Sequence, residues 1–216
     1  MKKQTILLLS AMAMLLAFVA GAWWFQGQQA EKIDTLASER SSLLAPDHAM
    51  TLGSKGARVE IVEFFDPACE TCALFHKPVK ELMATHPGRI RLVLRYAPFH
   101  KGAAGVVKIL EASRKQKKYW ETLELLFASQ RHWTSHHEAK LDLIWPLLPR
   151  LGLDVDRIRN DMGDVALDRL IQQDLADAAT LGIRKTPGFL VNGKPLPSFG
   201  FRQLRDLVEA EIAENY

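Results

Sequence analysis

The chain of 216 residues has two cysteines, which stand three positions apart in the string Cys69-Glu70-Thr71-Cys72. An apolar run rich in β-branched and aromatic residues, Val59 to Phe65, comes directly before them, and a stretch with helical periodicity follows. On the first turn of a helix this spacing lets the two sulfurs close a small disulfide ring, and the positive end of the helix dipole stabilises a thiolate on Cys69. The pattern predicts a redox-active dithiol in which Cys69 attacks and Cys72 resolves.

Two other roles for a CxxC pair are a structural disulfide and a metal site. A structural bridge over so short a loop removes little entropy from the unfolded chain. A soft metal such as Cu(I), or half of a zinc ribbon, also uses two thiolates. The sequence has no second CxxC, and the nearest histidine is His76, four residues past Cys72, so a closed metal site needs distant ligands. We favour redox chemistry without a metal and keep copper binding as an alternative.

The N-terminus indicates export. Lys2 and Lys3 precede the run from Ile6 to Phe25, which has no charged residue and as a helix spans about 30 Å, the thickness of a bilayer core. The positive-inside rule places those lysines in the cytoplasm and the rest of the chain outside it. We therefore expect the protein in the periplasm, or on the extracytoplasmic face of a bacterial inner membrane, where disulfides persist.

The same segment is open to two fates. Ala20-Gly21-Ala22 fits a signal-peptidase site, which releases a soluble periplasmic protein. The apolar run continues through Trp23-Trp24-Phe25, however, and tryptophans gather at membrane interfaces, which favours an uncleaved anchor and inner-membrane association through residues 6–25.

The formal charge of +3 falls to +1 without Lys2 and Lys3, so nothing indicates a nucleic-acid partner.

Residues 26–50 are polar and end in Pro46-Asp47, which is typical of a linker. Ile33, Leu36 and Leu43 recur at roughly helical spacing and could pair two chains, although we favour a linker helix without a partner.

A βαβ unit is predicted next. The strand Val59 to Phe65 leads into a helix from about Cys69 to Thr85, and Ile90 to Tyr96 alternates as a second strand. Two such strands joined by a helix run parallel with a right-handed crossover.

The rest of the chain divides into a helical region and a return to the sheet. Residues 101–181 show only helical patterns, at Val106 to Arg114, Tyr119 to Ser129, Ala139 to Leu148, Val155 to Met162 and Val165 to Leu181. After them we expect a hairpin that turns at Asn192-Gly193, with strands Gly188 to Val191 and Lys194 to Leu196, and a final helix from Phe201 to Ala213.

Three motifs in this order carry a family resemblance: Val62-Glu63-Phe64-Phe65-Asp66, Cys69-Glu70-Thr71-Cys72 and Thr186-Pro187-Gly188-Phe189-Leu190-Val191-Asn192-Gly193. Over about residues 50–214 the chain resembles the DsbA-like branch of the thioredoxin-fold thiol:disulfide oxidoreductases. The resemblance implies an α/β thioredoxin fold with an inserted all-helical subdomain. The expected parts are residues 1–25 as anchor or signal peptide, 26–50 as linker, 51–100 and 182–216 as the thioredoxin frame, and 101–181 as the insert.

The resemblance also implies roles for residues outside the CxxC pair. Pro187 is expected to follow a cis peptide bond and to pack against the disulfide, with the backbone of Thr186 binding a substrate strand. The alternative is an ordinary trans proline that opens a strand. Glu63 is expected to be a buried acid with a raised pKa that exchanges a proton with Cys72, unless it is an exposed strand residue paired with a lysine.

Between the cysteines, Glu70 and Thr71 replace the Pro-His of the best-known oxidant of this family. A carboxylate beside Cys69 opposes its thiolate, so we expect Glu70 and Thr71 to tune this protein to a weaker oxidant. No cofactor beyond the Cys69–Cys72 disulfide is expected. The implied partners are protein thiols and a membrane protein that reoxidises or reduces the dithiol, and we favour an oxidant over a reductase or isomerase.

Histidines elsewhere are more ambiguous. His132, His136 and His137 surround Trp133, and a solvated loop explains them more simply than a metal or pH switch. Phe99 and His100 follow the second strand and could line the substrate groove.

Overall fold

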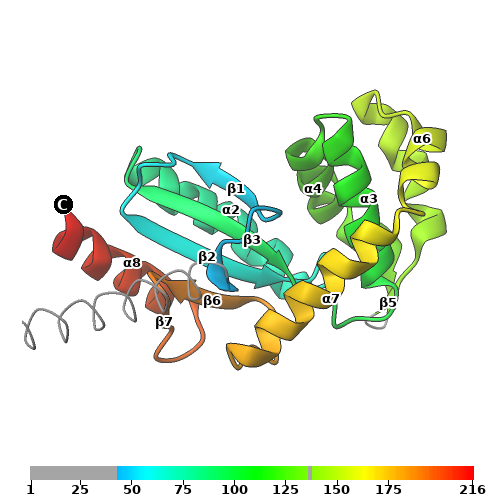
Figure 1. The fold of residues 1–216 in the computed structure, drawn as a ribbon. Helices are drawn as coiled ribbons and strands as arrows, with labels where there is room; N and C mark the ends of the chain where they lie inside the picture. The colour runs from blue at the N-terminus through cyan, green and yellow to red at the C-terminus, as the bar shows by residue number, and fades with distance from the viewer. Residues whose placement is uncertain (1–42, 136–137) are drawn as a thin grey trace, which may run out of the picture. The chain divides into compact units, whose positions relative to one another are not determined.

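A mixed β-sheet organises residues 47–216, the larger of the two compact units into which the chain divides. The computed structural model describes residues 43–135 and 138–216. In that part of the chain the main sheet has five strands in the order β1-β3-β2-β6-β7 (Figure 1). No helix among the described residues is both long and apolar enough to cross a bilayer. The predicted membrane segment, residues 6–25, and residues 26–42 of the predicted linker lie outside the described residues.

The predicted βαβ unit forms the centre of the sheet. Strand β2 (Val59–Phe65) leads into helix α2 (Glu70–Thr85), and β3 (Ile90–Tyr96) returns parallel to β2. Both strands are buried along nearly their whole length. Strands covered on both faces read as continuous apolar runs, which is why the alternation in β2 is imperfect.

The C-terminal hairpin also forms as predicted. Strand β6 (Gly188–Val191) pairs antiparallel with β2, and β7 (Lys194–Pro195) pairs antiparallel with β6. Between them Asn192 and Gly193 have φ values of 47° and 72°, the left-handed pair that a tight hairpin turn requires. Helix α8 (Phe201–Asn215) follows and packs beside α2 and against β2 and β6.

One edge strand was not predicted. Strand β1 (Met50–Gly53) pairs antiparallel with β3, with Thr51 opposite Val93. It has four partly or fully exposed residues at the sheet edge, so it shows neither a long apolar run nor a clear alternation. Its first residue, Met50, falls within the segment predicted as linker.

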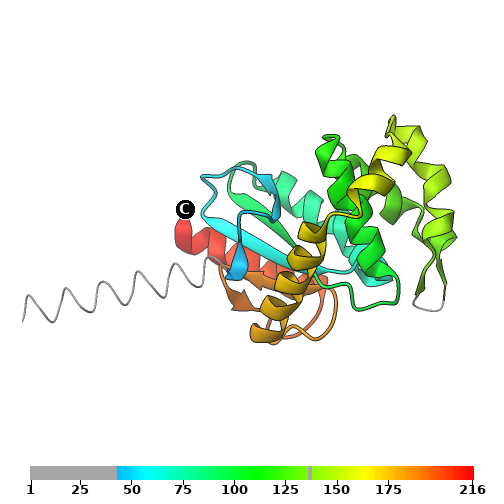
Figure 2. The same ribbon diagram turned by 45° about the vertical axis from the view of Figure 1, so that its right-hand side comes forward.

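The insert is mostly helical, and it lies beside the sheet at the end where β2 and β3 finish (Figure 2). Its helical elements are α3 (Ala103–Lys115), α4 (Tyr119–Ala128), α5 (Gln130–Trp133), η1 (Leu141–Leu143), η2 (Trp145–Leu151), α6 (Val155–Asp161) and α7 (Val165–Thr180).

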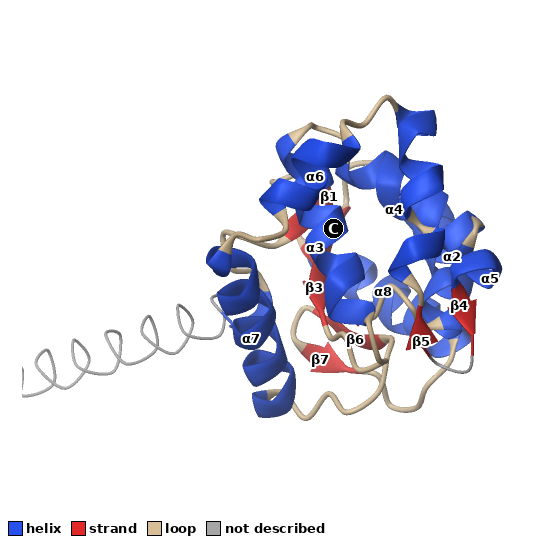
Figure 3. Ribbon diagram, turned by 90° about the vertical axis from the view of Figure 1, so that its right-hand side faces the viewer, coloured by secondary structure: helices blue, strands red, loops and turns tan. Residues whose placement is uncertain are grey.

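Two predictions for the insert were wrong. It is not all-helical, because β4 (Thr134–Ser135) and β5 (Glu138–Ala139) form a small two-stranded sheet beside α5 (Figure 3). Strands of two residues have no detectable period. The helix predicted from Ala139 to Leu148 is instead the pair of 3₁₀ segments η1 and η2, since Pro146 and Pro149 cannot donate the hydrogen bonds of an α-helix.

A buried ionic cluster joins the sheet to α7, which covers the face opposite α2 (Figure 1). The Arg95 guanidinium on β3 is fully buried and pairs with Asp174 and Asp177 of α7. The carboxylate of Asp174 also accepts from the backbone N–H of Tyr96 at 2.7 Å and pairs with the His48 imidazole at 2.6 Å. The cluster holds the last helix of the insert against the strand that leads into it.

Candidate active site

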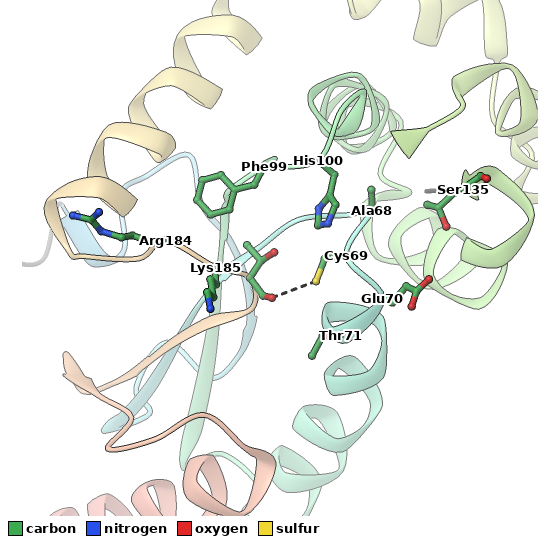
Figure 4. Close-up of a pocket in the computed structure, with 11 residues that line it drawn as sticks. Ala68, Cys69, Glu70, Thr71, Phe99, His100, Ser135, Arg184 and Lys185 are labelled. Atoms are coloured by element: carbon green, nitrogen blue, oxygen red, sulfur yellow. Dashed lines mark hydrogen bonds between the residues drawn. The ribbon is translucent and has the colours of Figure 1, made fainter. Parts of the chain in front are cut away.

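The two cysteines lie where β2 runs into α2. Asp66, Pro67 and Ala68 turn the chain, Cys69 caps the helix with extended backbone angles, and Cys72 lies in its first turn. Both are free thiols with little exposed surface, 6% for Cys69 and 0% for Cys72, but they differ in access to the space outside. Cys72 is completely buried, whereas Cys69 lines an open pocket of about 470 Å³ (Figure 4). Only Cys69 of the two therefore borders the pocket.

The Thr186–Pro187 peptide lies against this thiol. The bond is cis, as the resemblance implies. The carbonyl oxygen of Thr186 accepts a hydrogen bond from the Cys69 thiol at 3.3 Å, the contact drawn in Figure 4. Because β6 follows Pro187 directly and pairs with β2, the sheet brings together two segments that are more than a hundred residues apart in sequence.

The two thiols have opposite shifts in pKa. That of Cys69 is lowered from an ordinary 9.0 to about 6, first because the Cys72 thiol donates a hydrogen bond to its sulfur. Partial burial opposes this shift, while the Thr186 side chain and the backbone N–H groups of Cys72 and Thr71 lower the pKa further. The pKa of Cys72 is raised well above 9.0, chiefly by burial. At neutral pH the pair is therefore one reactive thiolate and one thiol.

The rate of alkylation of Cys69 should follow this pKa. In the reduced protein, the rate constant with iodoacetamide is expected to fall about tenfold per pH unit below pH 6 and to level off above pH 7, because only the thiolate reacts. In a Cys72→Ala variant the midpoint of this pH profile should move to higher pH, since the main hydrogen bond that stabilises the Cys69 thiolate is gone. A midpoint near 9 in the wild type contradicts this account, and one below about 4 contradicts the weaker oxidant predicted from the sequence.

Glu63 lies beneath the thiols on β2. Its side chain is buried, so the alternative of an exposed strand residue paired with a lysine is wrong. Burial raises its pKa to about 8, and the nearby negative charge of Cys69 adds to the effect. The carboxyl in turn raises the pKa of Cys72. Glu63 thus holds a proton at neutral pH, close enough to Cys72 to affect its pKa.

Glu70 and Thr71 have less influence than their positions suggested. The Glu70 side chain is exposed, and it is not among the main influences on the pKa of Cys69. Thr71 acts on Cys69 through its backbone hydrogen bond rather than through its hydroxyl.

A carboxylate that the sequence marked only as the end of a family motif shapes the segment before Cys69. Asp66 is fully buried; one oxygen accepts from the backbone N–H of Ala68, and the other accepts from the backbone N–H of His100 and pairs with its Nδ1, each at 2.7 Å. Phe99 and His100 line the pocket with Cys69, as the sequence suggested. The Asp66 side chain thus joins the loop after β3 to the turn before α2.

Gln130 was not recognised from the sequence. This buried residue of α5 donates from Nε2 to the carbonyl oxygens of Pro67 at 2.9 Å and Cys69 at 3.0 Å. The insert therefore holds the backbone on both sides of the turn that carries the reactive thiol. Nothing local marks Gln130, because its partners lie about 60 residues earlier in the chain.

A Gln130→Leu variant is expected to lose about 1–3 kcal/mol of unfolding free energy, because the buried Pro67 carbonyl loses the Gln130 amide without gaining water and the Cys69 carbonyl keeps only the Ala73 N–H. Urea unfolding of the reduced protein measures the loss. Gln116→Leu removes an equally long amide on the exposed surface, where it bonds to the backbone of Asp154. Equal losses in the two variants contradict a special role for the buried amide.

For the histidines around Trp133, the sequence favours a solvated loop, and the one that the structure describes agrees with it. His132 is exposed, while His136 and His137 lie outside the described residues. In the part of the chain that the structure describes, no three His, Cys, Asp or Glu side chains are placed to hold a metal ion.

Comparison with known proteins gives a consistent picture. The family model described as "Thioredoxin" matches residues 46–210. Among curated proteins, the Na(+)/H(+) antiporter NhaA of Herminiimonas arsenicoxydans is 29% identical over 73% of this chain. The chain spans about a quarter of the length of that antiporter, 25%. The Probable disulfide bond formation protein D of Bacillus anthracis is 25% identical over 80% of this chain and 82% of its own length.

Solved structures show the same fold. A thioredoxin-like oxidoreductase from Silicibacter pomeroyi DSS-3 is 30% identical, with a TM-score of 0.70 over 82% of this chain and 98% of that one. The α-DsbA1 of Wolbachia pipientis, at 20% identity, has a TM-score of 0.68 over 81% and 96% of the two chains.

Proposed function

Because this chain belongs to the thioredoxin family and has the fold and the dithiol of its DsbA-like thiol:disulfide oxidoreductases, we propose that it oxidises protein thiols outside the cytoplasm. The observation that carries the proposal is the asymmetric thiol pair. A reachable Cys69 with a pKa of about 6 lies against Thr186, and a buried Cys72 lies beside the protonated Glu63.

The oxidation runs in two exchanges. A substrate thiolate attacks the Cys69 sulfur of the disulfide, the bond to Cys72 breaks, and Cys72 leaves as a thiolate that takes the proton of Glu63. A second substrate thiolate then attacks the substrate sulfur of this mixed disulfide, and Cys69 leaves as a thiolate. Two electrons pass from the two substrate thiols to the dithiol, one of the two thiol protons replaces that of Glu63, and the other is released.

The low pKa of Cys69 favours this direction. A thiolate that is stable at neutral pH leaves easily in the second exchange, and it stabilises the reduced protein relative to the disulfide. The name of the Bacillus anthracis relative also refers to disulfide bond formation. A reductase or isomerase needs the same residues and differs in the partner that resets the dithiol.

We further propose that residues 6–25 hold the protein at the extracytoplasmic face of an inner membrane, where a membrane protein reoxidises the dithiol. Support comes from the uncharged run between Ile6 and Phe25 and from the lysines before it. Signal cleavage and release into the periplasm remains the alternative, and fractionation of cells separates the two.

The redox state of the thiols in the cell tests the direction. Alkylation trapping of growing cells is expected to find Cys69 and Cys72 mainly as a disulfide, since an oxidant is kept oxidised by its partner. A steady dithiol contradicts the oxidant and favours a reductase or isomerase. In vitro, the purified disulfide form should oxidise a reduced dithiol peptide at a rate that a Cys69→Ser variant abolishes. Tight Cu(I) retention by the dithiol without any thiol exchange favours metal binding instead.

A further inference from the structure

The two sides of the active-site pocket carry opposite charge. Arg184 and Lys185 lie on one side of Cys69, and Glu70 lies on the other (Figure 4). All three side chains are exposed. Neither cation forms an ion pair or a hydrogen bond with another side chain among residues 43–135 and 138–216. Their charge is therefore available to a molecule that enters the pocket.

Two other charged groups near the pocket already form ion pairs within the protein. Asp66 is buried and pairs with His100, which lines the pocket. Lys101, next to His100, forms an ion pair with Glu138 at 2.8 Å. The ionic groups that line the pocket with Cys69 and form no ion pair among the described residues are thus the two cations on the Thr186 side and the carboxylate of Glu70. Arg131 lies beyond Glu70, in a neighbouring pocket that does not include Cys69.

The position of the cations relative to Thr186 fixes what they can touch. Thr186 contacts the Cys69 sulfur through its carbonyl oxygen, and Arg184 and Lys185 come directly before it in the chain. A substrate strand that pairs with the backbone of Thr186 must pass alongside these two residues. At about 3.3 Å per residue, the positions one to three residues from the substrate cysteine come within reach of them.

We infer that this protein, as the thiol oxidoreductase proposed above, reacts preferentially with cysteines that have acidic side chains within about three residues. The exposed ring of Phe99 on the same side of the pocket adds a contact for an apolar neighbour. The preferred substrate segment is thus acidic and extended, and a basic segment is disfavoured by the same two cations.

The expected size of the preference is modest because the cations are in solvent. An exposed ion pair contributes about 0.2–1 kcal/mol, so each cation should favour an acidic peptide by up to about fivefold. The preference should shrink in 0.5 M salt, since screening acts strongly on exposed charges.

Three peptides with one cysteine each test the inference. They are identical except that two residues on each side of the cysteine are glutamate, glutamine or lysine. The second-order rate with which each peptide reduces the Cys69–Cys72 disulfide is divided by its rate with a neutral aromatic disulfide, which corrects for the peptide's own thiol pKa. The corrected rate for the glutamate peptide is expected to exceed that for the glutamine peptide by about threefold, with lysine slowest.

Variants identify the residues responsible. Arg184→Glu and Lys185→Glu should each lower the glutamate-to-glutamine ratio, and together they should reverse it. Lys55→Glu changes the net charge by the same amount at the turn before β2, the opposite end of that strand from the cysteines, and should leave the ratio unchanged. Equal ratios in the wild type, or an equal shift with Lys55→Glu, overturn the inference while leaving the proposed function intact. Failure of all three peptides to reduce the disulfide overturns the proposed function and the preference with it.

Discussion

Glutamine in place of Glu63 is expected to slow the resolution of the mixed disulfide by Cys72 about a hundredfold. Attack by the Cys69 thiolate should stay almost unchanged. Cys72 is fully buried and its pKa is raised well above 9.0, so it cannot easily exchange a proton with water. Glu63, with a pKa of about 8, can give or take that proton near neutral pH, and general acid–base catalysis typically contributes a hundredfold or more. Stopped-flow mixing with a disulfide peptide separates formation of the mixed disulfide from its resolution.

The same substitution should change how stability depends on pH. Folded Glu63 keeps its proton up to a pKa of about 8, whereas the unfolded chain loses it near 4.5. Between these values the folded state binds more protons, so the Glu63 contribution to stability is complete below pH 4.5 and is lost as pH rises to 8. At about 1.4 kcal/mol for each pH unit between the two pKa values, the loss reaches roughly 5 kcal/mol. Glutamine does not ionise and lacks this loss. The free energy of unfolding of the variant should therefore rise relative to that of the wild type between pH 4.5 and 8.

Glu60→Gln provides the matched control. Glu60 lies on the same strand, is partly exposed and forms an ion pair with Arg91 at 3.5 Å. Its replacement should leave the resolution rate near the wild-type value. An unchanged resolution rate in Glu63→Gln removes the proton-carrier role, and an unfolding free-energy difference that stays constant from pH 4.5 to 8 contradicts the raised pKa.

Replacement of Arg95 by methionine is expected to lower the free energy of unfolding by about 3–5 kcal/mol. The side chains have similar volumes, but the loss of the guanidinium leaves the buried carboxylates of Asp174 and Asp177 without their main cation. Chemical denaturation of the variant measures the effect.

Two further variants interpret the Arg95 result. A triple variant that combines Asp174→Asn and Asp177→Asn with Arg95→Met should recover part of the lost unfolding free energy, because no uncompensated charge remains. Lys77→Met breaks the exposed pair with Glu81 and should cost less than about 1 kcal/mol. Similar losses for Lys77→Met and Arg95→Met contradict the account of a buried cluster that holds α7 to the sheet.

The sequence predicted the parts of the fold that have strong local signals. The resemblance to DsbA-like oxidoreductases is confirmed, as are the βαβ unit, the hairpin at Asn192-Gly193 and the long helices of the insert. The short strands β1, β4 and β5 were missed because pairing with other segments, rather than local periodicity, defines them. The 3₁₀ segments replaced a predicted helix because two prolines overrode an apolar pattern.

The residues of the candidate site also fall into those that the sequence predicted and those that it did not. Cys69 and Cys72 stand out from their spacing alone, whereas Glu63 and Thr186-Pro187 were found only through the family resemblance. Gln130 and the pairing of Asp66 with His100 could not be predicted, because each depends on a contact between segments far apart in sequence. The influence expected of Glu70 came from its neighbouring position, but its exposed side chain is not among the main influences on the pKa of Cys69.

Trapping of the mixed disulfide tests the central claim most directly, because only one of the two sulfurs is open to a substrate. A Cys72→Ser variant incubated with a disulfide peptide should accumulate a covalent complex through Cys69, visible by mass spectrometry and released by reductant. A Cys69→Ser variant should form none under the same conditions, since Cys72 is buried and has a high pKa. Equal complexes from both variants, or a complex only through Cys72, contradict the assignment of Cys69 as the nucleophile beside Thr186.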